Sequence, residues 1–376
     1  MSKEYTALGL MSGTSMDGVD ASIIQSDGET KYKAIKDKYF EYPQETYLSL
    51  TKIRDKIKSS KDLKNFSKEI KNVEKEITLF HAKAVNQILK KTKANIDFIG
   101  FHGQTIYHNA KERISKQLGD GKLLSEITKK TVVYDFRQND LKNGGEGAPL
   151  TPIFHKMLTE KFKIAPATFL NLGGIANETN IYEDYGFHAS DKGPGMCLID
   201  NWIRLNSKKR YDKNGEVAKS GKINRAVLEK VLKKERDEFL KLSKKDPLWF
   251  EKKESTSYDI KDFNFNFVKG LSLEDGAATL TEYTVHRLLP SLNIANDCKD
   301  TIVLCGGGRK NKFLINSIKK HNIVLKFIDD YGIDGDFVES QAFAYLAVRS
   351  YLKLPISFPA TTGCLKACTG GEIIKF

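Results

Sequence analysis

The chain has 376 residues, of which 40% are hydrophobic and 29% charged, a composition typical of a folded protein and not of a disordered one. No apolar stretch approaches the about 18 residues that a membrane-spanning helix needs. The start, MSKEYTALGL, lacks the basic and apolar regions of an export signal. We therefore expect a cytoplasmic protein with two domains or one large one, since domains usually have about 100–200 residues.

The formal net charge is +13, from 61 basic and 48 acidic residues. Such an excess could indicate a nucleic-acid partner, but the lysines between residues 58 and 75 alternate with glutamates, as on the solvated face of a helix. No nucleic-acid-binding signature accompanies them. We expect no nucleic acid and no membrane as partner, and we interpret the charge as general attraction for anions, including a phosphorylated substrate.

The five cysteines are scattered and lack the spacing of a zinc site. We expect free thiols and no structural metal. Cys364 and Cys368 lie four residues apart, but Thr369–Gly371 argues against a regular helix there, and we assign them no function.

The amino-terminal third predicts a β-β-β-α-β-α-β module. Apolar residues between positions 66 and 91 recur every three or four residues, which is the helical period. The expected strands are 5–10, 19–25, 34–42, 95–100 and 131–134, and a short helix is expected over 123–129.

A similar cycle follows the glycine-rich link 143–149. Its expected strands include 168–172 and 301–305, and its expected helices are 196–205, 224–242, 277–289, one from about 311, and 339–351. Because the order strand, glycine turn, strand, strand, helix occurs twice, the sequence indicates a possible duplicated domain.

Three glycine turns follow strands: MSGTSMDG, NLGGIAN and CGGGRKN. Glycine lets backbone N–H groups approach a phosphate, and neither a Walker P-loop nor a GxGxxG fingerprint is present. The hydroxyls of Ser12, Thr14 and Ser15 could donate to phosphoryl oxygens, and Asp17 could hold Mg²⁺ through water. Each turn taken alone is more often a simple tight turn, and Asp17 could form an Asx turn.

With these residues in view, the chain resembles the anhydro-N-acetylmuramic acid kinases of the sugar kinase/Hsp70/actin superfamily. The resemblance runs nearly end to end. Its most specific segments are Gly9–Asp20, Phe101–Thr105, Gln117–Gly121, Asp135–Asp140, Gly144–Leu150, Asn171–Asn177, Asp191–Gly195, Gly306–Gly308 with Asn311, and Glu339 before Ala342–Ala344.

The resemblance implies an α/β fold of two ribonuclease-H-like domains with ATP and sugar in the cleft between them. We expect the first domain over 1–134 with 357–376, and the second, with an adenosine-binding glycine-rich turn, over 135–356. The implied reaction uses ATP and Mg²⁺ to phosphorylate O6 of 1,6-anhydro-N-acetylmuramic acid while water opens the anhydro ring, a step in peptidoglycan recycling. A homodimer is also implied.

The same resemblance implies site residues. Asp191 would be the base that takes the proton of the water, Arg137 would bind the lactyl carboxylate, and Glu339 would orient water or substrate. His102 and Gln104 would line the sugar pocket. The residues expected to bind ATP are Gly13, Thr14, Ser15, Met16, Asp17, Gly18, Val19, Asp20, Gly173, Gly174, Gly306, Gly307, Gly308 and Asn311.

Structural alternatives stand beside these roles. Asp191 could cap a helix beginning near Met196, Arg137 could form a surface ion pair, Glu339 could be an acid in the first turn of a helix, and His102 could be a structural histidine.

The chain departs from the family's DTGPGN segment, because Lys192 and Met196 replace its Thr and Asn. An inward Lys192 would lower the pKa of Asp191; we expect it to point outward. Residues 254–257 and 361–364 also keep only part of the family pattern. Two other functions remain open: a kinase of another amino sugar, and a catalytically silent ATP-dependent muropeptide sensor.

Overall fold

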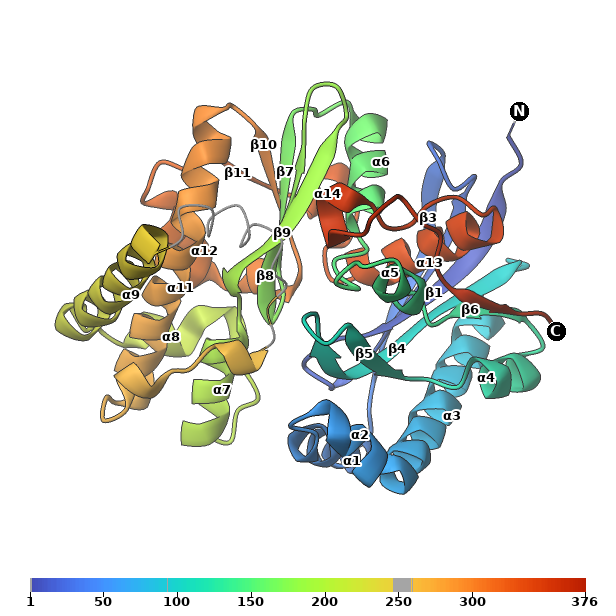
Figure 1. Ribbon diagram of the computed structural model, residues 1–376, viewed down its shortest axis with the longest axis horizontal. Helices are drawn as coiled ribbons and strands as arrows, with labels where there is room; N and C mark the ends of the chain where they lie inside the picture. The colour runs from blue at the N-terminus through green and yellow to red at the C-terminus, as the bar shows by residue number, and fades with distance from the viewer. Residues whose placement is uncertain (1, 93, 246–257, 259) are drawn as a thin grey trace. The chain divides into compact units, whose positions relative to one another are not determined.

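The structure is a computed structural model that describes residues 2–92, 94–245, 258 and 260–376. In these residues no helix combines the length and apolar content that a membrane span requires. The segment 254–257, where the sequence departs from the family pattern, lies outside them. The chain divides into two compact units, Met1–Lys163 with Asp336–Phe376, and Ile164–Gly335 (Figure 1). Each unit has its own sheet.

The first unit is built on a seven-stranded sheet in the order β12-β6-β4-β1-β2-β3, with β5 paired to β4. Strand β2 pairs antiparallel with both β1 and β3, whereas β4 is parallel to β1 and β6 is parallel to β4. The strands are β1 Tyr5–Ser12, β2 Gly18–Ser26, β3 Tyr32–Glu41, β4 Phe98–Asn109, β5 Ile114–Leu118, β6 Thr131–Tyr134 and β12 Glu372–Ile374.

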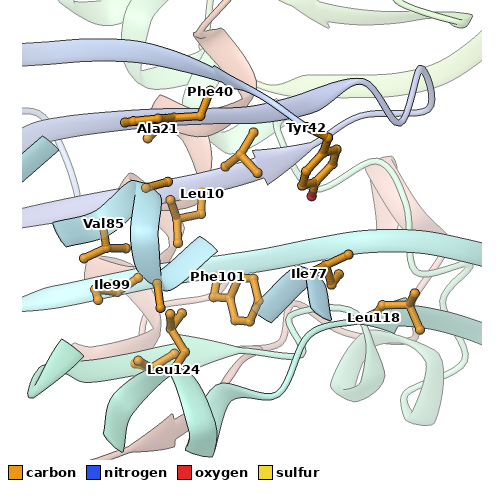
Figure 2. Close-up of a cluster of buried hydrophobic side chains, with 14 of the residues drawn as sticks. Leu10, Ala21, Phe40, Tyr42, Ile77, Val85, Ile99, Phe101, Leu118 and Leu124 are labelled. Carbon is orange, nitrogen blue, oxygen red and sulfur yellow. The ribbon is translucent and has the colours of Figure 1, made fainter. Parts of the chain in front are cut away.

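One face of this sheet carries a large hydrophobic core. Helix α3 (Ser67–Lys91) turns Ile77 and Val85 toward Leu10, Ile99 and Phe101 of the sheet (Figure 2). The helical period found in the sequence supplies this apolar face. The other helices of the unit are α1 Gln44–Lys56, α2 Ser60–Asn65, α4 Gly121–Thr128, α5 Gln138–Lys142, α6 Pro152–Phe162, α13 Val338–Tyr351 and α14 Pro359–Thr362.

Helix α13 packs directly on the backbone of β1 and β4. A Cβ atom added to Gly9 would lie 1.8 Å from the Ser340 carbonyl oxygen, and one added to Gly100 would lie 2.2 Å from that of Phe343. Only glycine permits so close an approach. The contact places residues 338–351 in the first unit although they are distant in sequence.

This packing moves the unit boundaries away from the expected positions 134 and 356, to 163 and 336. Helix α6 also belongs to the first unit. Its Phe154 ring lies 5.3 Å from that of Tyr32 in β3 and 5.5 Å from that of Tyr345 in α13, measured between centroids. The aromatic contacts join the segment after residue 134 to the first sheet.

The second unit repeats the strand order. Its five-stranded sheet runs β11-β10-β7-β8-β9, with β7, β8 and β9 antiparallel and β10 and β11 parallel to β7. Two ribonuclease-H-like units are therefore confirmed. The strands are β7 Ala167–Leu172, β8 Ile175–Ile181, β9 Phe187–Pro194, β10 Thr301–Cys305 and β11 Leu325–Phe327, and the helices are α7 Cys197–Asn206, α8 Glu216–Ser220, α9 Arg225–Lys245, α11 Leu273–Asp297 and α12 Lys312–Lys319.

Buried histidines make the stability of the first unit depend on pH. Burial lowers the pKa of His81 to about 4 and that of His155 to about 3. An unfolded histidine has a pKa of about 6.5. Their contribution to stability is thus fully present above pH 6.5 and is lost as the pH falls, because the unfolded chain takes up these protons first.

We expect the free energy of unfolding to fall by up to about 1.4 kcal/mol per pH unit for each histidine between about pH 6.5 and 4. Urea unfolding followed by circular dichroism at several pH values checks this, with His81→Leu expected to flatten the slope. A free energy that is constant across the window would contradict the prediction.

Candidate active site

The first glycine turn links β1 to β2 in the first unit. Thr14 and Ser15 are exposed at its tip, whereas Met16 takes a positive φ of 57° and buries its side chain. The Ser15 hydroxyl donates to Asp17 Oδ1 at 2.6 Å. The turn therefore presents two hydroxyls and one carboxylate together, groups suited to a phosphate with its metal ion.

Gln104 supports this turn through hydrogen bonds to its residues. Its side chain is buried, and Nε2 donates to the carbonyl oxygens of Gly13 at 3.0 Å and Thr105 at 3.2 Å. The Ser12 hydroxyl lies 2.7 Å from Gln104 Oε1 and accepts a hydrogen bond from Tyr42. Both amide protons are thus engaged by backbone. The expected sugar contact of Gln104 stays a prediction, while the geometry gives it a role in shaping the turn.

His102 and Arg137 form a second group in the same unit. Arginine can only donate, so His102 Nε2 accepts from Arg137, at 2.9 Å from Nη2 and 3.3 Å from Nε. The ring proton is then on Nδ1, which donates to the Gly103 carbonyl at 2.9 Å. Burial and the Arg137 charge hold the pKa of His102 well below its usual value. The neutral ring orients the guanidinium, whose Nη1 donates to the Gly147 carbonyl at 2.6 Å.

Glu339 lies in the first turn of α13 and is half-buried. A carboxylate in this position is stabilised by the partial positive charge of the helix N-terminus. The first unit thus carries three of the expected site features: the hydroxyl-bearing turn, Arg137 and Glu339.

In the second unit, the turn Gly173–Gly174 between β7 and β8 is anchored to the start of α7. The Gly173 carbonyl accepts from Met196 N at 2.8 Å, and the Gly174 carbonyl accepts from Cys197 N at 3.0 Å. A Cβ atom at Gly195 would lie 2.2 Å from the Gly173 oxygen, so this junction requires glycine. The turn therefore fixes the strand end that carries Asp191.

Asp191 lies within β9, opposite Asn177 of β8, and its Oδ2 accepts from Tyr258 N at 2.7 Å. The N-cap of α7 is Met196. Asp191 is therefore not the cap of that helix, and the structural alternative considered from the sequence is wrong. Its carboxylate remains a candidate proton acceptor.

Lys192 occupies a β-bulge, because Asp191 pairs with Asn177 while Gly193 pairs with Ala176. Its ammonium lies 3.4 Å from Oε1 of Glu178, a residue that is 3% exposed. The outward direction expected for Lys192 stays a prediction, and its ammonium is engaged in this ion pair. The charge of Lys192 is compensated by Glu178.

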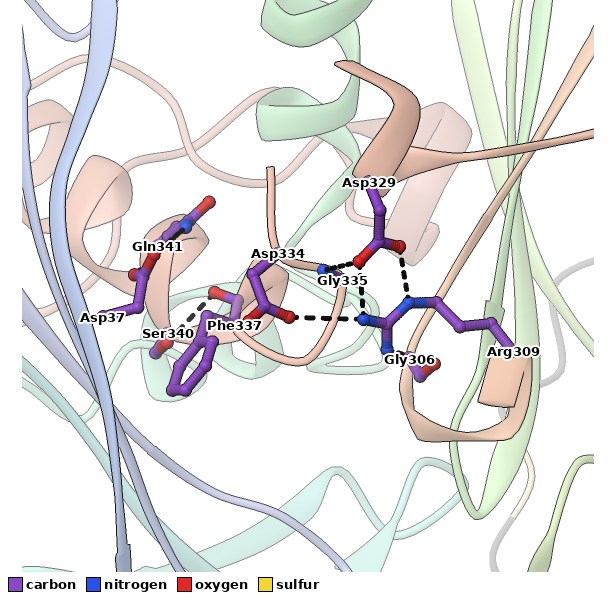
Figure 3. Close-up of polar contacts among 9 residues, drawn as sticks. All are labelled: Asp37, Gly306, Arg309, Asp329, Asp334, Gly335, Phe337, Ser340 and Gln341. Carbon is purple, nitrogen blue, oxygen red and sulfur yellow. Dashed lines mark hydrogen bonds and ion pairs between the residues drawn. The ribbon is translucent and has the colours of Figure 1, made fainter. Parts of the chain in front are cut away.

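The third glycine turn, Gly306–Gly308, is held by Arg309, which the sequence reasoning missed. Figure 3 shows its buried guanidinium joined to both Asp329 oxygens, at 2.7 and 2.8 Å, and to Asp334 at 3.2 Å. Hydrogen bonding by Arg309 lowers the pKa of Asp329. Its acidic partners, Asp329 and Asp334, lie twenty or more positions after Arg309, so no local sequence motif indicates these contacts.

Asn311 caps α12 through Oδ1, which accepts from Leu314 N at 3.0 Å. Its Nδ2 is buried and has no hydrogen-bond partner among the residues that the structure describes. A buried donor without a partner is unfavourable. An acceptor on a ligand at this turn would satisfy it, which fits the expected adenosine site.

Two ribonuclease-H-like units in one chain, with a glycine turn after the first strand of each, define a protein of the sugar kinase/Hsp70/actin class. More narrowly, the chain belongs to the anhydro-N-acetylmuramic acid kinase family, whose model matches residues 5–375. As a member of this family it is a kinase.

Two relatives of this chain carry the family's name. A protein of Pelagibacter ubique (strain HTCC1062) named anhydro-N-acetylmuramic acid kinase is 51% identical over 385 residues, covering 100% of both chains. One of Agrobacterium fabrum with the same name is 36% identical, also over 100% of both chains.

Among solved structures, component A of the Acidaminococcus fermentans (R)-2-hydroxyglutaryl-CoA dehydratase aligns with a TM-score of 0.43 at 12% identity. The alignment covers 93% of this chain and 100% of that one. The fold of this chain is defined by its own sheet order.

Proposed function

We propose that this chain is an ATP-dependent kinase that opens 1,6-anhydro-N-acetylmuramic acid with water and phosphorylates O6, giving N-acetylmuramic acid 6-phosphate. The observation that carries the proposal is the family match from residue 5 to residue 375, which spans both units and all candidate site residues. The enzyme would act in the cytoplasm, as a homodimer, in peptidoglycan recycling.

In the proposed reaction, Asp191 accepts a proton from water as the water oxygen bonds to the anomeric carbon. The bond between this carbon and O6 breaks, and O6 takes the γ-phosphoryl group of ATP while ADP leaves. The hydrogen bond from Tyr258 N holds one oxygen of the Asp191 carboxylate. Because Glu178 pairs with Lys192, the lysine charge is not left uncompensated beside the base.

Arg137 is suited to bind the lactyl carboxylate of the sugar, because a guanidinium can donate two parallel hydrogen bonds. His102 and the Gly147 carbonyl fix its orientation before substrate arrives. Glu339 would orient the water or the sugar from the start of α13. His102 would then act through Arg137.

The exposed hydroxyls of Thr14 and Ser15 would donate to phosphoryl oxygens of ATP, and Asn311 would donate its free amide proton to the nucleoside. Asp17 would hold Mg²⁺ through water, and the ion would neutralise phosphate charge. Gln104 keeps the first turn in shape for this contact through the Gly13 carbonyl.

The experiment that tests the proposal is a mass-resolved assay with Mg-ATP and 1,6-anhydro-N-acetylmuramic acid in ¹⁸O-labelled water. We expect N-acetylmuramic acid 6-phosphate with the label on its anomeric oxygen, because water and not O6 supplies that atom. N-acetylmuramic acid as the preferred substrate would favour a kinase of another amino sugar. ATP binding without any sugar phosphate would favour a sensor and overturn the proposal.

A further inference from the structure

Two thiols and a carboxylate meet in the interior of the first unit. One ligand atom from each of Asp140, Cys364 and Cys368 lies within 4.8 Å of the other two, and all three residues are buried. Asp140 comes from α5, Cys364 follows α14, and Cys368 pairs with Ser357 in an isolated β-bridge. Segments more than 200 residues apart in sequence therefore converge on one point.

The carboxylate of Asp140 is buried and accepts two hydrogen bonds. The side chain is 1% exposed; Oδ1 accepts from the Thr362 hydroxyl at 2.6 Å and Oδ2 accepts from Gly147 N at 2.6 Å. Both oxygens thus act as acceptors, as they would toward a cation. Within the described ranges no cationic side chain forms an ion pair with it. A carboxylate removed from water is stabilised by a bound cation, so a cation that binds Asp140 here would stabilise the unit.

The donor atoms identify the kind of cation. Thiolate sulfur prefers zinc and copper(I), whereas Mg²⁺ and Ca²⁺ take oxygen ligands. We propose that Asp140, Cys364 and Cys368 form a binding site for a thiophilic divalent cation, Zn²⁺, with water as the fourth ligand. Binding forms two metal–sulfur bonds and one metal–oxygen bond, and it releases the two thiol protons to solvent.

Burial, with the charge of Asp140 as a smaller cause, raises the pKa of Cys364 to about 11. Without a cation this thiol is therefore protonated. Sequence spacing missed the site because its third ligand comes from residue 140, far from the cysteine pair.

The site lies next to the loop around Gly147, to which Arg137 donates a hydrogen bond. Asp140 accepts from Gly147 N, and the Gly147 carbonyl accepts from Arg137. The same loop is tied to the cysteine segment, since Glu146 N donates to the Thr362 carbonyl at 2.8 Å and Leu365 N to that of Asn143 at 3.0 Å. A cation bound by Asp140 on one side and by Cys364 and Cys368 on the other would hold this loop in place. The proposal concerns metal binding and does not depend on the reaction proposed above.

Cobalt binding to the fully reduced, chelator-treated full-length chain tests this proposal, because Co²⁺ bound by thiolates absorbs strongly in the near ultraviolet. We expect one equivalent of Co²⁺ to produce this charge-transfer absorption and one equivalent of Zn²⁺ to remove it. Cys364→Ser and Cys368→Ser should each weaken Zn²⁺ binding, measured by chelator competition, at least about a hundredfold.

The matched control is Cys298→Ser, because Cys298 is the exposed thiol among the five cysteines. This variant should keep the spectrum and the Zn²⁺ affinity of the unaltered chain. Absence of the thiolate band in the unaltered, reduced chain would overturn the proposal without any variant. So would its loss in Cys298→Ser, or its survival in both Cys364→Ser and Cys368→Ser.

Discussion

Replacing Asp191 by asparagine should lower the turnover number at least about a hundredfold while ATP and sugar still bind, since this is the usual effect of losing a general base. Asparagine keeps the shape of the side chain and can still accept the hydrogen bond from Tyr258 N. The loss should therefore be confined to proton transfer. Steady-state kinetics with calorimetric titration of both ligands separates turnover from binding.

The control is Glu183→Gln, which neutralises an exposed acid of the same unit in the connection between β8 and β9. It should keep full turnover. Near-normal turnover in Asp191→Asn would remove Asp191 from the mechanism, and weakened binding of both ligands would instead indicate a disturbed β9.

Substituting Gly9 by alanine should destabilise the first unit by more than about 4 kcal/mol, because the new methyl group would overlap the Ser340 carbonyl oxygen, 1.8 Å away. Neither a strand backbone nor a helix backbone can move aside cheaply. We expect little folded protein, or a greatly lowered midpoint in thermal unfolding followed by circular dichroism.

Gly13→Ala is the matched control for stability, because a Cβ atom there meets nothing within 4 Å. It should unfold close to the unaltered chain. If Gly9→Ala were equally stable, α13 could not lie directly against β1.

Local patterns predicted much of the fold. Apolar residues at helical spacing predicted α3, and β1, β2 and β3 were expected close to their observed bounds. The boundaries of the two units were not predictable in this way, because they depend on α13 packing against Gly9 and Gly100. Contacts between segments distant in sequence leave no periodic signal.

The sequence predicts which turn could bind phosphate, but it does not predict the hydrogen bonds that support this turn. Glycine, hydroxyl and acidic residues in one turn identified Gly13–Asp17 as a phosphate site, which remains a prediction. The sequence did not reveal that Gln104 donates to the Gly13 carbonyl, or that His102 accepts a hydrogen bond from Arg137. Such partnerships depend on which strands lie side by side, and one residue type can serve either as a ligand contact or as support.

The two sheets share one strand order, but their first turns differ in chemistry. In the first unit the turn exposes Thr14 and Ser15, whereas the carbonyls of Gly173 and Gly174 are occupied by the start of α7. The two units therefore share their strand order but differ in the chemical groups that their first turns present. Two copies of one strand order can carry different turns. Exchanging the two turn sequences should therefore impair both units, although the strand order of each unit would accept a short hairpin.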